Sequence, residues 1–384
     1  MATITITAQQ ATYPIYHSAV LVVDSTLKAN DDFRYVFKIT VGAVTRKVRV
    51  APRPGDGYGY LNLSPHLQNF IDIESPNIKS TSDFITGPHV DYEVNIDEEW
   101  TVAGVPNINV DVLTFSARVG FDTVLNRNDE LAYTTPLYQL TDVNTRILWN
   151  VEEGHDIHRD DLFWLYMNNL TGSLIKLRVR EVAASGFVIT DNVTTFTPTQ
   201  KANLARMDLS SYPLDAGTVK IAVQFLDNLN APISEVKIMN IVEPCTKYTK
   251  HKFLYLGSYG SYSSINFDMK SFQNTSIGAK SYRKFIDSSS DTDVSRGITR
   301  FFVDSKTIHT ANTDIVSDSH FRMLEDLFKS KRAFLDVRND SNYPDVDFLP
   351  IEVISRNIAN QKQENNTAPQ YSMQWRFAFE EVNR

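Results

Sequence analysis

The chain lacks several features that would point to a particular class of protein. It has one cysteine, Cys245, in 384 residues, which excludes an internal disulfide and a cysteine-based zinc site. No uninterrupted apolar run reaches the length of a membrane-spanning helix. The first residues alternate threonine with isoleucine and lack the basic and apolar regions of a secretory signal. We therefore expect no membrane insertion, folding in a cytoplasm, and a buried, apolar role for Cys245.

The sequence also lacks a dense block of lysine and arginine. Its formal net charge is -8 and its pI is about 5.5. A chain of this charge does not attract a phosphate backbone as a whole. We therefore expect no sequence-specific binding of nucleic acid.

Alternation of apolar and polar residues is the dominant pattern that is present. In residues 371–379, tyrosine, methionine, tryptophan and phenylalanine alternate with smaller or polar residues, which predicts a strand with one buried face. Further strands are predicted at 18–24, 33–41, 44–50, 92–96, 110–117, 162–167, 174–182, 187–190, 219–226, 234–242, 333–337 and 348–354. These segments predict a mainly β fold of several antiparallel β-sandwich or barrel-like domains with a few short helices.

Length, linkers and helix signals suggest how these strands are grouped. A chain this long favours two or three domains. We predict an N-terminal β domain (1–120), an immunoglobulin- or fibronectin-like β-sandwich with its linker (121–245), and a C-terminal α+β domain with an antiparallel sheet (246–384). Ser64 as N-cap and Pro65 at the first position predict a helix start. The apolar spacing of 321–328 predicts a second helix, capped by Ser317 or Asp318.

The segment 152–161 is the strongest candidate for a metal site. Histidines and carboxylates are interleaved in it: Glu152, Glu153, His155, Asp156, His158, Asp160 and Asp161. Histidines three residues apart face the same side only on a helix, and Gly154 together with the dense charge favours an exposed loop that enters the strand at Leu162. We therefore predict a solvated turn and assign no metal-binding residue.

Three other segments carry weaker signals. Residues 287–293 offer carboxylate oxygens for calcium but lack the glycine and terminal glutamate of a calcium loop, which favours a mobile loop. The glycines of 55–59 lack the Lys-Ser/Thr ending of a phosphate-binding loop, so a tight turn is expected. The tyrosines of 255–262 indicate either a sugar- or protein-binding surface or, with more weight, an aromatic sheet core with a turn. No catalytic or cofactor-binding residue is assigned, and we expect no enzyme.

Three stretches resemble virion structural proteins of tailed bacteriophages, especially crAss-like and related phages of Bacteroidota. They are residues 30–64, with Phe33-Arg34-Tyr35, Pro52-Arg53-Pro54 and Gly57-Tyr58-Gly59-Tyr60; residues 253–267, whose aromatic strands are interrupted by glycine and serine; and the helix and strands of 321–377. The resemblance implies a protein present in many copies in the tail or the head-to-tail neck.

The expectation that follows is a structural, non-enzymatic virion protein that forms a homo-oligomeric ring or hub. Its expected partners are copies of itself and other phage tail or neck proteins, with assembly in the bacterial host cytoplasm and a final place in the virion. A net acidic chain suits a ring through which DNA must pass without being gripped. The alternative is a receptor- or carbohydrate-binding tail module that uses Tyr259 and Tyr262, and a metal-dependent hydrolase using His155 and His158 comes third.

Overall fold

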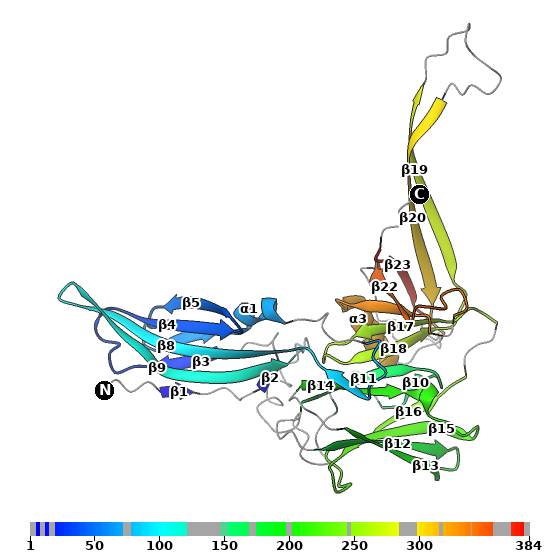
Figure 1. The fold of residues 1–384 in the computed structure, drawn as a ribbon, viewed down its shortest axis with the longest axis horizontal. Helices are drawn as coiled ribbons and strands as arrows, with labels where there is room; N and C mark the ends of the chain where they lie inside the picture. Colours follow the sequence, from blue (N-terminus) through cyan, green and yellow to red (C-terminus); the bar gives the residue numbers. More distant parts are fainter. Residues whose placement is uncertain are drawn as a thin grey trace, which may run out of the picture. The chain divides into compact units, whose positions relative to one another are not determined.

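The fold was analysed in a computed structural model, which divides by its internal contacts into two compact units (Figure 1). It describes residues 5–7, 12–14, 20–71, 78–120, 147, 149, 151, 153–168, 174–196, 202–243, 247–283, 298–314, 318–338, 340–355 and 370–379. Unit 1 is Met1–Ile241 with Leu256–Ser263, and unit 2 is Val242–Tyr255 with Ser264–Arg384. Cys245, residues 287–293 and Ser317 lie outside the described residues.

The first part of unit 1 contains two antiparallel sheets with one edge strand added in parallel. Strand order is β2-β9-β8-β4-β5 in one sheet and β1-β3-β6 in the other. The strands are β1 (Thr5–Thr7), β2 (Thr12–Pro14), β3 (Val20–Asp24), β4 (Asp31–Val41), β5 (Val44–Val50), β6 (Gly59–Asn62), β8 (His89–Val102) and β9 (Val105–Gly120). Alternate residues of β3, β4, β6 and β8 form one apolar cluster that includes Leu21, Tyr35, Phe37, Val94 and Ile96.

The second part of unit 1 has a five-stranded sheet of order β10-β16-β15-β12-β13 and the antiparallel run β11-β14-β7. The strands are β7 (Phe84–Thr86), β10 (His155–Ile157), β11 (Leu162–Asn168), β12 (Ile175–Ala183), β13 (Val188–Phe196), β14 (Ala202–Asp208), β15 (Thr218–Leu226) and β16 (Lys237–Ile241). Segment Leu256–Ser263 completes this unit, and its Tyr262 pairs with Trp164 of β11.

Unit 2 has strand order β19-β20-β23-β22-β21-β17-β18 and one long helix. The elements are β17 (His251–Leu256), β18 (Tyr262–Phe267), β19 (Phe272–Arg283), β20 (Ile298–Asn312), α3 (Asp318–Lys329), β21 (Ala333–Asp336), β22 (Phe348–Val353) and β23 (Ser372–Phe377). Helix α3 buries Met323, Leu324 and Leu327, and β23 buries Met373 and Trp375 while the residues between them are exposed.

An aromatic cluster fills the centre of the sheet in unit 2. Trp375 stacks on His309 with ring centroids 4.3 Å apart and meets Phe253 edge-on at 5.7 Å. His251 lies against Phe253 and Trp375. Burial, with a smaller contribution from His309, lowers the pKa of His251 below its usual 6.5.

The mainly β fold class is confirmed, and most predicted strands are present within a residue or two. Strands β2, β6, β7, β10, β14, β19 and β20 were not predicted. The first helix differs from its prediction: α1 (Ser64–Leu67) is a single turn continued by the 3-10 turn η1 (Gln68–Phe70), and Leu63, not Ser64, is its N-cap. The Asn62 Oδ1 accepts the Ser64 N–H at 3.2 Å, so the capping oxygen comes from an earlier residue. The three-domain division stays a prediction.

Candidate functional site

The segment around His155 and His158 is buried, and the predicted exposed loop is wrong. Residues 155–157 form β10, which pairs in parallel with Met239–Ile241 of β16. His155 is 2% exposed, His158 3% and Asp161 0%. The dense charge of the segment predicted an exposed loop. In the structure, the alternation of side chains along β10 buries His155 and Ile157 and leaves Asp156 exposed.

Three donor groups of this segment lie close enough to hold a cation. One ligand atom each from His158, Asp160 and Asp161 lies within 4.8 Å of the others, and no second group of this kind occurs in the described part of the chain. The Asp161 Oδ2, however, accepts the His158 N–H at 2.8 Å, and the Asp161 carbonyl accepts the Leu209 N–H at 2.9 Å. Asp161 therefore closes the turn between β10 and β11, which accounts for its burial without a metal. His155 is not a member of the group.

The tyrosine-rich segment is core and turn, as the weightier of its two interpretations predicted. Tyr255 and Tyr262 are fully buried, and Ser261 and Ser263 beside them are also buried. The Trp149 indole N–H donates to the Ser263 Oγ at 3.1 Å. The segment therefore presents no row of exposed tyrosines, because five of the six residues of β18 are buried and Tyr259, in the turn, is half-buried.

The glycine-rich loop uses its own backbone donors, so the predicted tight turn is confirmed. The Gly57 N–H donates to the Arg53 carbonyl and the Tyr58 N–H to the Asp56 Oδ1. The Tyr60 hydroxyl donates to the Asp56 Oδ2 at 2.7 Å. These bonds lower the pKa of Asp56, with the Tyr58 N–H as the largest cause. The N–H groups of Gly57 and Tyr58 are therefore used within the loop and do not point to a phosphate-binding site.

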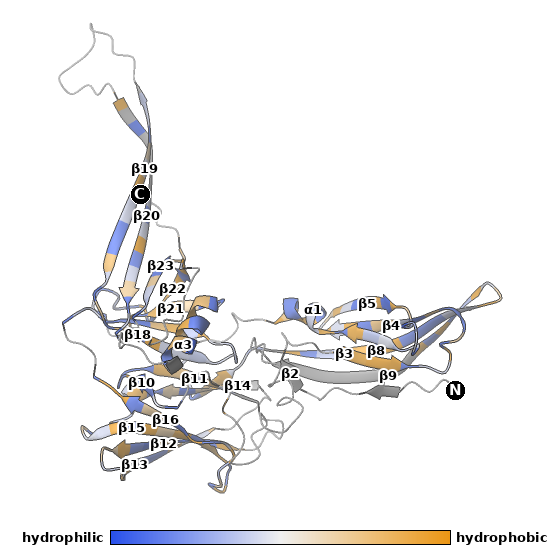
Figure 2. Cartoon of the chain, turned by 180° about the vertical axis from the view of Figure 1, so that it is seen from behind, coloured by the Kyte–Doolittle hydropathy of each residue, from blue (hydrophilic) through white to orange (hydrophobic). Residues whose placement is uncertain are grey.

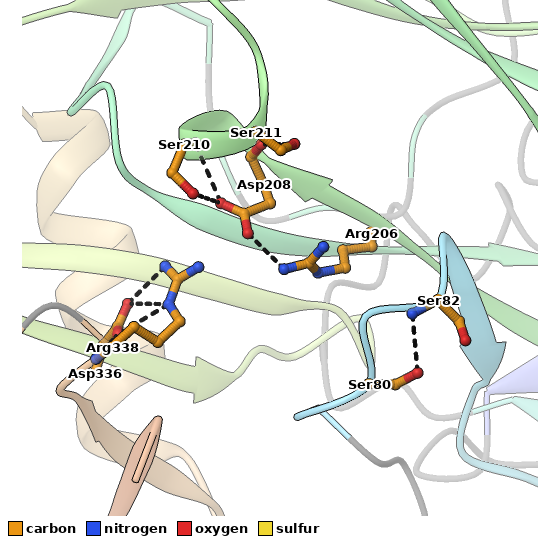
Figure 3. Close-up of polar contacts among 8 residues, drawn as sticks. All are labelled: Ser80, Ser82, Arg206, Asp208, Ser210, Ser211, Asp336 and Arg338. Carbon is orange, nitrogen blue, oxygen red and sulfur yellow. Dashed lines mark hydrogen bonds and ion pairs between the residues drawn. The ribbon is translucent and has the colours of Figure 1, made fainter. Parts of the chain in front are cut away.

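Two arginine–carboxylate pairs two residues apart along the chain each lock a turn (Figure 3). In unit 1, Arg206 pairs with Asp208, whose Oδ1 also accepts from the Ser210 N–H and hydroxyl at the start of the 3-10 turn η3 (Leu209–Ser211). In unit 2, the Arg338 Nη2 donates to the Asp336 Oδ2 at 2.8 Å and its Nε to the Asp336 Oδ1 at 3.0 Å. Both carboxylates are thus held by donors of their own chain.

A buried carboxylate that the sequence analysis did not single out lies in β12. Glu181 is 0% exposed, and its Oε2 accepts the Thr218 hydroxyl at 2.6 Å and the Asp215 N–H at 2.8 Å. Arg159 holds the same turn by donating to the Asp215 and Thr218 carbonyls. The sequence contains a signal for the burial of this carboxylate. Glu181 continues the alternation of inward positions that begins with Ile175, Leu177 and Val179. The arrangement fastens the 215–218 turn to the sheet.

Exposed apolar side chains occur on several elements, including the β12–β13 turn with Phe187 (77% exposed) and the β15–β16 connection with Leu229 (80%), and they also occur along two long hairpins. The tip of the β8–β9 hairpin carries Val102, Val105, Ile108 and Val110, which are 51%, 62%, 60% and 59% exposed. The β19–β20 ribbon carries Phe272, Ile277, Tyr282 and Ile298, which are 57%, 63%, 49% and 65% exposed. Figure 2 shows the apolar turn between β8 and β9. Such side chains mark surfaces suited to contact with other molecules.

Comparison with known proteins adds no family. No protein-family model matches this chain, and no curated protein matches it. Within the described residues, no helix is both long and apolar enough to cross a bilayer.

Proposed function

We propose that this chain is a structural, non-enzymatic subunit of a tailed-phage virion that assembles with copies of itself into a ring or hub of the tail or head-to-tail neck. Neighbouring tail or neck proteins are its other partners, and assembly takes place in the host cytoplasm. The phage assignment rests on the sequence resemblance described above. The assignment as an assembling subunit rests on one structural observation, the open edge of β9.

Strand β9 has an edge that natural monomers usually protect. Its one outer neighbour in the described chain, β2, pairs with it only at Arg118–Gly120, so the backbone from Val105 onward is open along that side. Residues 100–110 contain no charged side chain. Pro106 is the one residue of this stretch that lacks a backbone N–H donor. Monomeric proteins blunt such edges with charge, short strands or a covering loop. An apolar open edge supports contact with another subunit.

The turn of this hairpin is apolar although its backbone conformation is strained for a residue that has a β-carbon. Ala103 and Gly104 both have positive φ, 49° and 78°. Such two-residue turns usually place asparagine, aspartate or glycine first, because a β-carbon is strained in the left-handed region. Alanine here adds a methyl group to the apolar surface between Val102 and Val105, which supports a role in contact.

The rival role in receptor or carbohydrate binding named Tyr259 and Tyr262, of which Tyr259 is half-buried and Tyr262 lies in the core. Tyr262 is fully buried, so replacing it with alanine would disturb the core and would not test glycan binding.

The mass of the purified chain in solution, with negative-stain images of the same peak, tests the proposal. Closed rings or a defined higher oligomer are the expected result. A monomer that persists at the highest attainable concentration contradicts self-assembly.

A further inference from the structure

The β19–β20 ribbon extends beyond the sheet of unit 2 (Figure 1). Its strands pair with each other from Phe272↔Thr310 to Arg283↔Ile298. Strand β23 pairs with β20 only at His309–Asn312. Beyond that point no third strand supports the ribbon in the described chain, over a length of about 30 Å at about 3.3 Å per residue. A two-stranded ribbon is only marginally stable in water, so it gains from a partner surface.

The ribbon is basic, in contrast to the rest of the chain. Lys280, Arg283, Arg300 and Lys306 outnumber Asp304, which gives the two strands a net charge of +3. The net charge of the whole chain is -8, so the net charge of the chain without these two strands is -11. Lys280, Arg300 and Lys306 are exposed. Exposed Ile277 and Tyr282 stand on opposite faces, because five residues separate them along one strand.

A surface of matching character lies in the β21–β22 connection, residues 337–347. Asp345 and Asp347 are exposed there, and exposed Asp340 holds the turn itself, since its Oδ1 accepts the Asn342 N–H at 2.9 Å. The one basic residue of the connection, Arg338, is engaged by Asp336 in the bidentate pair drawn in Figure 3. Exposed Pro344 adds apolar surface beside Asp345. The connection thus offers carboxylates and apolar atoms together, as the ribbon offers cations and apolar atoms together.

We propose that the β19–β20 ribbon of one copy docks on the β21–β22 connection of a second copy. This inference rests on the proposed function and adds, to the open edge of β9, a second pair of surfaces that join its subunits. The ribbon and the connection are different surfaces of the chain, so the contact runs head to tail and can close a ring. The negative net charge of the remaining chain, -11, repels a DNA duplex but attracts the basic ribbon of a neighbouring copy. A second copy is therefore favoured over DNA as the partner of the ribbon.

Charge reversal and its rescue test the docking. The variants are K280E/R300E on the ribbon, D345K/D347K on the connection, and the two combined. Each reversal alone is expected to lower the oligomer mass to that of a monomer at concentrations where the wild type is assembled. The combined variant is expected to recover at least half of the assembled fraction, because opposite charges face each other again with their places exchanged.

The controls separate this docking from its alternatives. K47E/K220E changes two other exposed lysines by the same total charge and is expected to leave the assembly intact, while melting curves confirm that every variant is folded. An assembled wild type whose single reversals also remain assembled overturns the docking but keeps the proposed function. A monomeric wild type overturns both. Binding of duplex DNA that K280E/R300E abolishes, with mass unchanged, would identify the ribbon as a nucleic-acid arm and overturn the docking.

Discussion

At the scale of single residues, buried polar groups fix turns in this protein. Glu181, Asp161 and Asp208 are each almost fully buried, and each accepts hydrogen bonds from a turn that follows or faces its strand. A buried carboxylate is expensive unless such donors satisfy it. Their removal should therefore act on stability.

Replacing Glu181 with alanine should destabilise unit 1 by about 3 kcal/mol, because the Thr218 hydroxyl and the Asp215 N–H lose their shared acceptor in the interior. Glu181→Gln keeps an acceptor oxygen and should lose about 1 kcal/mol. Urea unfolding gives both values, and Glu153→Ala, at an exposed site, is the matched control. Equal effects of the alanine and glutamine variants would contradict this role.

Gly59 should tolerate no side chain, because a β-carbon there would lie 2.5 Å from the Cδ2 of Tyr35. Tyr35 is fully buried, and its hydroxyl donates to the Gly57 carbonyl at 3.0 Å, so the ring has little freedom to move. Gly59→Ala should lose about 2 kcal/mol through overpacking. In a Tyr35→Val background the same substitution should lose much less, which a double-mutant cycle measures. Additive effects would show that the ring is not the obstacle.

At the scale of elements, local sequence patterns predicted the strand and the helix that each bury one face. They missed the features that depend on contact between distant segments of the chain. The alternation in 371–379 and the spacing of 321–328 identified β23 and α3, because each pattern reflects one buried face. Strand β10 was missed because its pairing with β16, over eighty residues away, and the burial of its His155 are decided by tertiary contact. The candidate metal segment was misjudged for the same reason. The exposure of the tyrosine segment likewise depends on what covers it.

The open edge of β9 should be sensitive to charge. Ile108→Lys with Val110→Lys adds two cations to the exposed stretch 100–110, which carries no charge, and this should weaken assembly while leaving the melting temperature of the monomer within a few degrees. Light scattering over a concentration series measures the first effect and calorimetry the second. Val44→Lys, on exposed β5, is the matched control. Unchanged assembly in the double variant would remove the edge of β9 from the interface.

At the scale of the whole molecule, the chain passes between its two units three times, after Ile241, after Tyr255 and after Ser263. His251, His309 and Trp375 all belong to unit 2. The neutral form of His251 is favoured there, because burial lowers its pKa below 6.5. A half-buried titrating group in one unit should make that unit respond to pH on its own.

The sign of this response follows from proton linkage. In the unfolded chain His251 takes up a proton near its usual pKa of 6.5, whereas the folded chain binds it only at lower pH. The stability of unit 2 should therefore be full above pH 6.5 and fall as the pH drops below it, until the folded pKa is reached. Scanning calorimetry between pH 8 and pH 5 measures the fall. His251→Phe keeps a ring beside Phe253 and Trp375 but cannot titrate, so its melting temperature should fall less over this range. An equal fall in both proteins would assign the pH response to other groups.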